Sequence, residues 1–338
     1  MKKLLASLLL ILSAAVAVPA LCADSLEEVR KAAGQGDRES QFNLGLRYET
    51  GKGGVKQDLE TAANWYRKAA RQGHAKAQTN LGNFYRAGRS VEKNYGEAMR
   101  LYRLAADQGD TRAMINIAMM YASGQGVDKD EAEGLKWLEK AAGAGDTQAM
   151  VQLGTLYRAG KGVGKNDAMA TEWFRLAAAK GNTVAQHNLG LSYFTGNGNT
   201  KDYAESVKWH RKAAGKGYPP AEYSMGLRYA RGDGVKQNYT EAARWYQKAA
   251  RHGHISAQNN LGLMYRKGQG VDQDYAEAAT WFRKAAEQGN ARARFNLGNL
   301  YLKGQGVKPD REEARKWFAM AADQGHRGSR EALDSMNK

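Results

Sequence analysis

The chain has 338 residues, of which 42% are hydrophobic and 9% aromatic, so its composition excludes a disordered protein. The 51 Lys and Arg outnumber the 35 Asp and Glu, and the formal net charge of +16 at pH 7 favours anionic partners. A single Cys excludes a disulfide framework and a Cys-based metal site. The 39 Gly and only four Pro are typical of many short helices that each end at a Gly.

The first 23 residues have the pattern of a secretory signal peptide. Two lysines precede an apolar stretch, residues 4–18, which is shorter than the roughly 20 residues that a membrane-spanning helix needs. We expect cleavage after Ala23, with Ala20 as the alternative. The mature chain is therefore expected to be periplasmic or secreted, without a membrane-spanning segment. Export makes nucleic acid an unexpected partner.

From residue 37 onward the sequence repeats with a period of 36 residues. Trp occupies seven of eight equivalent positions, with Leu101 in the other, and a Tyr recurs in all eight repeats. The first interval between these Tyr residues is 37, because Gly53-Gly54 carries one extra residue. Residues 24–36 and 326–338 are predicted to be capping helices that cover the ends. The eight repeats are predicted at residues 37–73, 74–109, 110–145, 146–181, 182–217, 218–253, 254–289 and 290–325.

Each repeat is predicted to form two helices joined by a turn. In the seventh repeat, residues 257–265 place their small and apolar side chains on one stripe, Gly268 ends the first helix, and Asp274 begins the second. Asp or Asn stands at this second-helix start in every repeat and predicts an N-cap, worth about 1 kcal/mol. Glu follows three residues later in six of the eight repeats, the pattern of a capping box. A recurring Gly on the first helix is predicted to let a neighbouring helix approach, while the Trp fills the gap between repeats.

The seventh repeat contains Ala-Gln-Asn-Asn-Leu-Gly-Leu-Met-Tyr, then Gly-Gln-Gly-Val, then Trp-Phe-Arg-Lys-Ala-Ala. These segments resemble the Sel-one-like repeat (SLR), a relative of the tetratricopeptide repeat, and the resemblance covers residues 37–325. It implies an all-α fold, a right-handed αα-superhelix (solenoid) with a concave groove. Bacterial relatives are mostly exported adaptors, so the resemblance also implies a non-catalytic protein–protein interaction protein without a cofactor. We expect a monomer, because a capped solenoid needs no partner to complete its core.

The candidate binding residues lie on the first helices, which line the groove in such a superhelix. The residue before the Leu-Gly pair is polar in every repeat, and these positions are Asn43, Asn80, Asn116, Gln152, Asn188, Ser224, Asn260 and Asn296. We call these eight side chains the ladder; their polar groups can hydrogen-bond an extended peptide backbone. Arg follows the repeat Tyr at Arg86, Arg158 and Arg266, where it would bind acidic or C-terminal carboxylate groups. The alternative is that the ladder groups bond the loop of the neighbouring repeat and that the Arg side chains are merely solvated.

Apolar side chains next to the ladder are predicted to form pockets in the groove. They are Phe42, Ile115, Val151, His187, Tyr223 and Phe295. We therefore expect the groove to bind another protein or peptide segment that is extended and acidic. The alternative partner is an envelope glycan or anionic lipid bound through overall charge.

No set of residues predicts catalysis or a metal site. Ser-x-x-Lys occurs at 90–93 and 335–338, but Lys-Thr-Gly is absent from the sequence, so a β-lactam-binding enzyme is a distant alternative. The glycine-rich run at 160–165 lacks the Ser or Thr of a phosphate-binding loop. Three of the six His residues, His74, His254 and His326, occupy the helix-opening position and are predicted to be caps.

Overall fold

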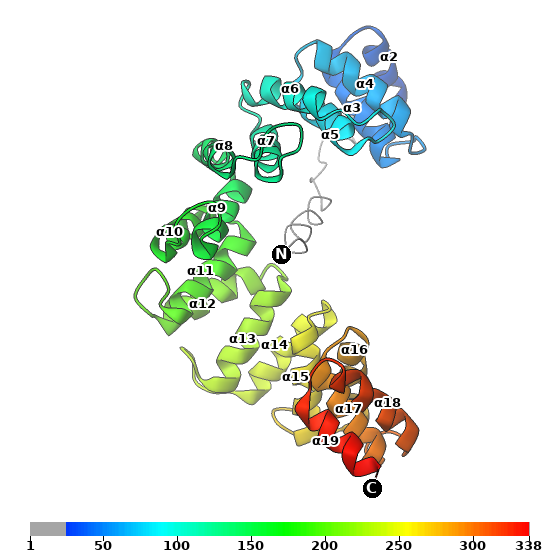
Figure 1. Cartoon of the computed structure of the whole chain (residues 1–338), viewed down its shortest axis with the longest axis vertical. Coiled ribbons are helices and arrows are strands. Elements are labelled where there is room, and N and C mark those ends of the chain that lie inside the picture. Colours follow the sequence, from blue (N-terminus) through cyan, green and yellow to red (C-terminus); the bar gives the residue numbers. More distant parts are fainter. Residues whose placement is uncertain (1–24, 338) are drawn as a thin grey trace. The chain divides into compact units, whose positions relative to one another are not determined.

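The computed structural model describes residues 25–337, which fold into helices joined by short loops (Figure 1). Within these residues there are 18 helices and no strand, so the predicted all-α solenoid of helical hairpins is confirmed. The proposed signal peptide lies outside the described residues. The two end helices are α2 (Leu26–Gly34) and α19 (Arg327–Met336).

Each repeat consists of a first and a second helix. The first helices are α3 (Arg38–Thr50), α5 (Ala75–Ala87), α7 (Thr111–Ser123), α9 (Thr147–Ala159), α11 (Thr183–Thr195), α13 (Pro219–Arg231), α15 (Ile255–Lys267) and α17 (Ala291–Lys303). The second helices are α4 (Leu59–Arg71), α6 (Tyr95–Ala106), α8 (Glu131–Gly143), α10 (Asp167–Ala179), α12 (Tyr203–Ala214), α14 (Tyr239–Arg251), α16 (Tyr275–Glu287) and α18 (Arg311–Ala322).

The helices belong to two compact units, one up to Ala149 and one from Met150 onward. In the first unit, each helix from α3 to α7 packs on the helix before it and on the helix after it. The same holds in the second unit for the helices from α11 to α18. Each repeat is therefore stabilised by its immediate neighbours in the chain.

The predicted N-caps of the second helices are confirmed in all eight repeats. Asp274, for example, accepts a hydrogen bond from the backbone N–H of Glu277 at 2.9 Å. The predicted capping boxes of these helices are wrong, because the Glu side chain does not return to the cap. Glu277 instead accepts a hydrogen bond from the indole N–H of Trp281 at 3.1 Å. A complete capping box forms at α2, between Ser25 and Glu28.

The turn between the two helices of a repeat is held by its own backbone. The first helix ends at a Gly in the left-handed conformation, such as Gly268 with a φ of 62°, where a side chain would be strained. After the turn, the backbone N–H of the second-helix cap donates to the carbonyl of the repeat Tyr. In the seventh repeat this bond joins Asp274 to Tyr265 at 3.0 Å. The same bond forms in all eight repeats, including the first, where the turn contains one more residue.

The recurring Gly of the first helix lets the second helix of the repeat approach, as predicted, and it also makes room for an aromatic ring of that helix. A Cβ on Gly262 would lie 2.7 Å from Phe282 Cδ1 and 3.2 Å from the Ala278 carbonyl oxygen, and a Cβ on Gly82 would lie 2.6 Å from Tyr102 Cε1. The aromatic ring was not part of the prediction. The ring comes from the second helix of the same repeat, so this contact closes each hairpin.

The Trp residues pack between repeats, as predicted. Trp281 on α16 is 7% exposed and joins the core cluster formed by α14 and α15, which contains Tyr246 and Leu261. Trp317 on α18 is 6% exposed and joins the cluster formed by α16 and α17. The Trp of one repeat therefore completes the core of the repeat before it.

Candidate functional site

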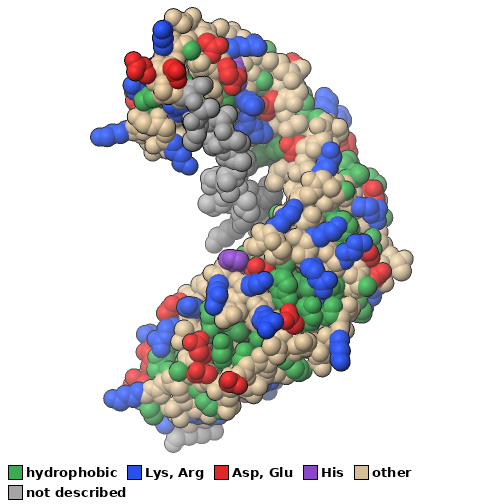
Figure 2. Space-filling view, turned by 180° about the vertical axis from the view of Figure 1, so that it is seen from behind, with side chains coloured by type: hydrophobic (Ala, Val, Ile, Leu, Met, Phe, Trp, Pro, Cys, Tyr) green, Lys and Arg blue, Asp and Glu red, His purple; other side chains and the backbone are tan. Residues whose placement is uncertain are grey.

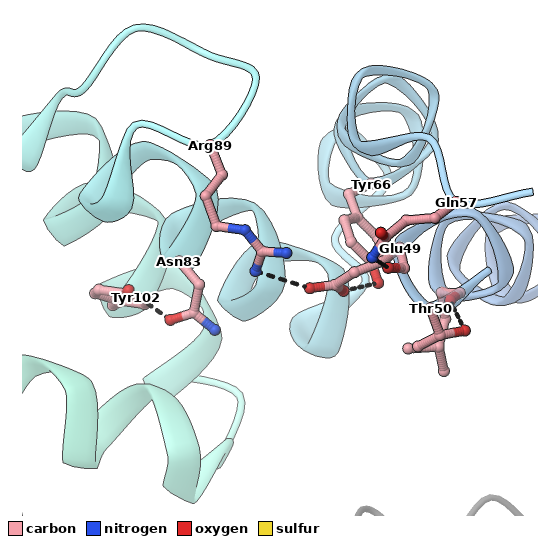
Figure 3. A network of polar contacts seen from close by, with 8 residues as sticks. Glu49, Thr50, Gln57, Tyr66, Asn83, Arg89 and Tyr102 are labelled. Atoms are coloured by element: carbon pink, nitrogen blue, oxygen red, sulfur yellow. Dashed lines mark hydrogen bonds and ion pairs between the residues drawn. The ribbon is translucent and has the colours of Figure 1, made fainter. Parts of the chain in front are cut away.

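Polar side chains on the first helices of the first unit form a hydrogen-bonded network (Figure 3). Glu49 at the end of α3 accepts hydrogen bonds from the Tyr66 hydroxyl at 2.6 Å and from Arg89 at 3.3 Å. Burial raises the pKa of Tyr66, and the nearby Glu49 carboxylate raises it further, so Tyr66 stays a neutral donor. The network joins α3 and α4 to the segment that follows α5.

A second part of this network contains a ladder residue. Asn83 on α5 accepts hydrogen bonds from the Tyr102 hydroxyl at 2.7 Å and from the Asn116 amide at 3.1 Å. Burial raises the pKa of Tyr102 to about 12, with the nearby Arg86 acting in the opposite direction. The sequence indicated Asn116 and Arg86 as candidates but not Asn83, which occupies a column that holds Leu in four of the other repeats.

In the second unit the ladder residues contact the Arg residues that follow the repeat Tyr. Arg158 on α9 donates to the Asn188 side-chain oxygen on α11 at 3.1 Å. Arg266 on α15 makes the equivalent bond to Asn296 on α17 at 3.2 Å. The Asn296 amide donates in turn to Asn259 at 3.1 Å. Each Arg is thus held by the ladder residue of the next repeat.

Burial divides the ladder into two groups. Asn116, Asn188, Ser224 and Asn296 are 5%, 8%, 5% and 8% exposed. Asn43, Asn80, Gln152 and Asn260 are partly exposed. The alternative interpretation, that ladder groups bond neighbouring repeats, therefore describes Asn116, Asn188 and Asn296, although their partners lie on first helices and not in loops. The partly exposed group remains accessible to a ligand.

The accessible ladder residues also lie beside tyrosine hydroxyl groups. Asn80 is within hydrogen-bonding reach of the Tyr66 hydroxyl, and Asn260 is within reach of the Tyr246 hydroxyl. Burial raises the pKa of Tyr246 to about 12. Both tyrosines are buried, so the accessible group of each pair is the amide, which can donate and accept hydrogen bonds.

The predicted apolar pockets are wrong, because these side chains belong to the packing between repeats. Phe42 is 8% exposed and stacks on His74 of the next repeat, with ring centroids 4.5 Å apart. Tyr223 stacks in the same way on His254 at 4.4 Å. Ile115 and Val151 are buried as well, and Phe295 packs against Phe318 and His326.

The predicted histidine caps are confirmed. Nδ1 of His74 accepts a hydrogen bond from the Ala77 backbone N–H at 3.1 Å, and His254 and His326 cap their helices in the same way. The stacking described above gives these rings a second structural role, which the sequence analysis missed. Their position at the start of the helix and the aromatic residue 31 or 32 positions earlier would have indicated it.

A buried histidine pair in the fifth repeat was also missed. His210 on α12 is fully buried, at 0% exposed, and its ring centroid lies 5.2 Å from that of His187 on α11. His210 Nδ1 lies 3.3 Å from the Ser206 hydroxyl, while His210 Nε2 and His187 Nδ1 are buried without a hydrogen-bond partner. Burial lowers the pKa of His187 to about 4 and that of His210 to about 3, so both rings are neutral at pH 7.

Residues 25–337 contain no group of three His, Cys, Asp or Glu side chains placed to hold a metal ion. Of the helices in this part of the chain, none combines the length and the apolar character that crossing a membrane requires. The polar face of the first helices is the candidate site because it carries amides, hydroxyls and guanidinium groups suited to hydrogen bonding.

Comparison with known proteins identifies the class. The Sel1 repeat model matches the chain eight times, at residues 38–74, 75–110, 111–146, 147–182, 183–218, 219–254, 255–290 and 291–326. The chain belongs to the Sel1 repeat family, and the predicted resemblance is confirmed. Proteins of this family are generally interaction adaptors.

Two solved structures are similar over most of the chain. A Sel1 repeat protein from Oxalobacter formigenes is 33% identical, with a TM-score of 0.74, over 94% of this chain and 92% of that protein. The protective antigen c5321 of uropathogenic Escherichia coli, which has an SLR fold, is 33% identical, with a TM-score of 0.64, over 92% of this chain and 74% of that protein. No curated protein matches the chain.

Proposed function

We propose that the protein is an exported, non-catalytic adaptor that binds an extended, acidic protein segment along the face formed by its first helices. The observation that carries this proposal is the pairing of Arg158 with Asn188 and of Arg266 with Asn296. Each pair holds a guanidinium group in place while using few of its five N–H donors. An oriented Arg can bind a carboxylate through two parallel hydrogen bonds, which are stronger than neutral ones.

Accessible amides occur at the ladder position in each of the two units. Asn43, Asn80, Gln152 and Asn260 recur at one repeat position and are partly exposed. An amide both donates and accepts, so each can bond the N–H and the C=O of a peptide backbone. The buried Asn188 and Asn296 hold Arg side chains, and we propose that the partly exposed ladder residues contact the partner.

The burial of Arg158 supports a role in binding a carboxylate. Burial lowers the pKa of Arg158, which means that its charge has lost part of its hydration. A partner carboxylate would restore a favourable environment for this charge. The same group in solvent would gain little from an ion pair.

The proposal is tested by a crosslinked pull-down from a cell-envelope extract, with washes at low and high salt. Arg158→Gln combined with Arg266→Gln should remove the captured protein while the helical circular dichroism signal is kept. The matched control, Arg251→Gln with Arg292→Gln, removes the same charge from exposed positions outside the ladder and should leave capture unchanged. Equal loss in both variants would show that net charge, rather than this face, binds the partner.

A second candidate function is the electrostatic binding of an envelope glycan. One observation favours it: in five repeats a Lys lies over the Trp ring three residues earlier, as Lys212 does over Trp209 at 4.1 Å and Lys284 over Trp281 at 4.4 Å. Lys and Arg side chains are, however, spread among hydrophobic and acidic ones in the surface view of Figure 2. Retention of polysaccharide at low salt alone would favour this second function over the first.

A further inference from the structure

The last residue of the first helix divides the repeats into two classes. In the first five repeats this residue is neutral: Thr50, Ala87, Ser123, Ala159 and Thr195. In the last three it is a cation: Arg231, Lys267 and Lys303. All eight positions are exposed. We call Arg231, Lys267 and Lys303 the cation row.

The helix dipole alone does not explain the cation row. A cation at a helix C-terminus is stabilised by about 0.3 to 1 kcal/mol. All eight first helices end in the same way, at a Gly, so this benefit is available to every repeat. Three consecutive cations after five consecutive neutral residues therefore indicate a requirement specific to α13, α15 and α17.

The cation row shares a face with the ladder. In α15, Asn260, Leu263 and Lys267 are spaced by three and four residues, so they lie on one side of the helix. The equivalent residues of α13 are Ser224, Leu227 and Arg231, and those of α17 are Asn296, Asn299 and Lys303. Leu227 and Leu263 are only partly buried. In α13 and α15 this face thus presents a partly exposed Leu and a cation, while α17 has Asn299 in place of the Leu. Of the three ladder residues, Asn260 is partly exposed, whereas Ser224 and Asn296 are buried.

These three helices lie next to one another through side-chain contacts. Arg266 of α15 bonds Asn296 of α17. Tyr223 of α13 stacks on His254, the N-cap of α15, with ring centroids 4.4 Å apart. The cations themselves are free to bind a ligand, because no ion pair within residues 25–337 includes Arg231, Lys267 or Lys303. Asp233, the acidic residue that follows α13, pairs with Arg228 instead.

We infer that the face of α13, α15 and α17 binds an extended peptide that carries a carboxylate at every third residue, with apolar side chains between. The inference rests on the proposed function and places the acidic segment in the last three repeats. Packed helices lie about 10 Å apart, and an extended chain advances about 3.3 Å per residue. Three residues therefore span one repeat, and one carboxylate meets each cation. The partly exposed Leu227 and Leu263 contact the apolar side chains.

Charge favours a foreign acidic segment over a second copy of the chain. The whole chain carries a net charge of +16, so two copies repel each other when their cationic faces meet. An acidic peptide is attracted to the same face. A second copy on this face would be detected as a dimer by analytical ultracentrifugation. If such a dimer formed and the cation-row variant abolished it, the inference would be wrong.

The test uses two synthetic ten-residue peptides of identical composition, measured by fluorescence anisotropy against the full chain. One carries Asp at positions 2, 5 and 8 with Leu and Ser between them, on the spacing of about three residues per repeat. The other carries the three Asp together. We expect the spaced peptide to bind at least about tenfold more tightly, which corresponds to about 1.4 kcal/mol. Equal affinity for the two peptides would overturn the inference.

The matching variant is Arg231→Ala, Lys267→Ser and Lys303→Thr, which installs residues that the first five repeats already have at this position. It should fold and should lose at least about tenfold in affinity for the spaced peptide, since each exposed charge pair contributes up to about 1 kcal/mol. The control variant, Lys236→Gln, Arg251→Gln and Lys308→Gln, removes three other exposed cations and should bind as the unchanged protein does. An equal loss in the two variants would overturn the inference.

The two proposals fail in distinguishable ways. If the cation-row variant still captures the envelope protein while the Arg158 and Arg266 variant does not, the adaptor function stands and the placement in the last three repeats is wrong. If neither variant changes capture, the first-helix face is not the binding surface and both proposals are wrong.

Discussion

The buried histidine pair makes the stability of the fifth repeat depend on pH. His187 and His210 replace residues that are aromatic in several other repeats, such as Phe295 at the first position and Phe282 at the second. Their environment opposes protonation: burial is the main cause, and the positive charge of Arg158 acts on His187 as well. The charge of Arg228 acts on His210 in the same direction.

The direction of the pH dependence follows from the histidine pKa values in the folded and unfolded states. An unfolded histidine has a pKa of about 6.5, while the folded values are about 4 for His187 and about 3 for His210. The unfolded state therefore binds more protons below pH 6.5, so the stability contributed by the neutral rings is present above this pH and lost as the pH falls toward the folded values. At pH 5 the linkage amounts to about 2 kcal/mol for each ring.

The assay is urea unfolding between pH 7.5 and pH 5, with hydrogen exchange of α11 and α12 to detect local opening. His187→Phe combined with His210→Phe should flatten the pH dependence by up to about 4 kcal/mol at pH 5. Ser206 stays hydrogen-bonded in this variant, because its hydroxyl also donates to the Gly190 carbonyl at 2.7 Å. The control is His326→Asn, which removes a histidine from a capping position.

This reasoning is wrong if the unchanged protein and the double Phe variant lose the same free energy of unfolding between pH 7.5 and pH 5. Carboxylates do not obscure the result. Hydrogen bonds hold the pKa of Asp37 below its usual range, with those from Ser40 contributing most. A depressed carboxylate pKa costs stability only as the pH falls below about 4. The two pH windows are therefore separate.

Three further predictions concern packing and caps, each measured by urea unfolding. Gly262→Ala should lower the free energy of unfolding by about 1–3 kcal/mol, because its Cβ would lie 2.7 Å from Phe282 Cδ1, whereas Gly34→Ala, with nothing within 4 Å, should not be destabilising. Asp274→Ala should cost about 1 kcal/mol by removing an N-cap, and the exposed neighbour Asp272→Ala should cost less than half of that. His254→Asn should keep the cap but lose about 0.5–1.5 kcal/mol of ring stacking on Tyr223; an unchanged stability would show that the stacking contributes nothing.

Features that depend on neighbours in sequence were predictable. The caps Asp274 and His254 and the helix-ending Gly268 act within a few residues, so residue type and position were sufficient. The capping box prediction failed because other donors compete for the Glu. In two repeats the indole N–H of the Trp four residues later donates to the Glu carboxylate, as Trp281 does to Glu277. In the other four an Arg or Lys three residues after the Glu donates to it, which a pattern restricted to the cap does not include.

Features that depend on which helices are adjacent were harder to predict. Helical periodicity places Phe42 on a face of α3 but does not say that His74, 32 residues later, covers it. The ladder and the Arg residues were identified as two separate columns, whereas Arg158 and Asn188 are in contact across 30 residues. Comparing the Arg position of one repeat with the ladder position of the next repeat, 30 residues later, would have indicated this pairing.

The hydrogen bonds between repeats have a mechanical consequence. Gln72 bonds Gln41, and Arg89 bonds Glu49, across 31 and 40 residues, so these links close loops of about one repeat. A force applied to the two ends therefore acts on the repeats in series. Each repeat can unfold while distant repeats stay folded. Stretching the protein should lengthen it in small, equal steps, and on relaxation the repeats should rejoin one after another on any neighbour that has stayed folded.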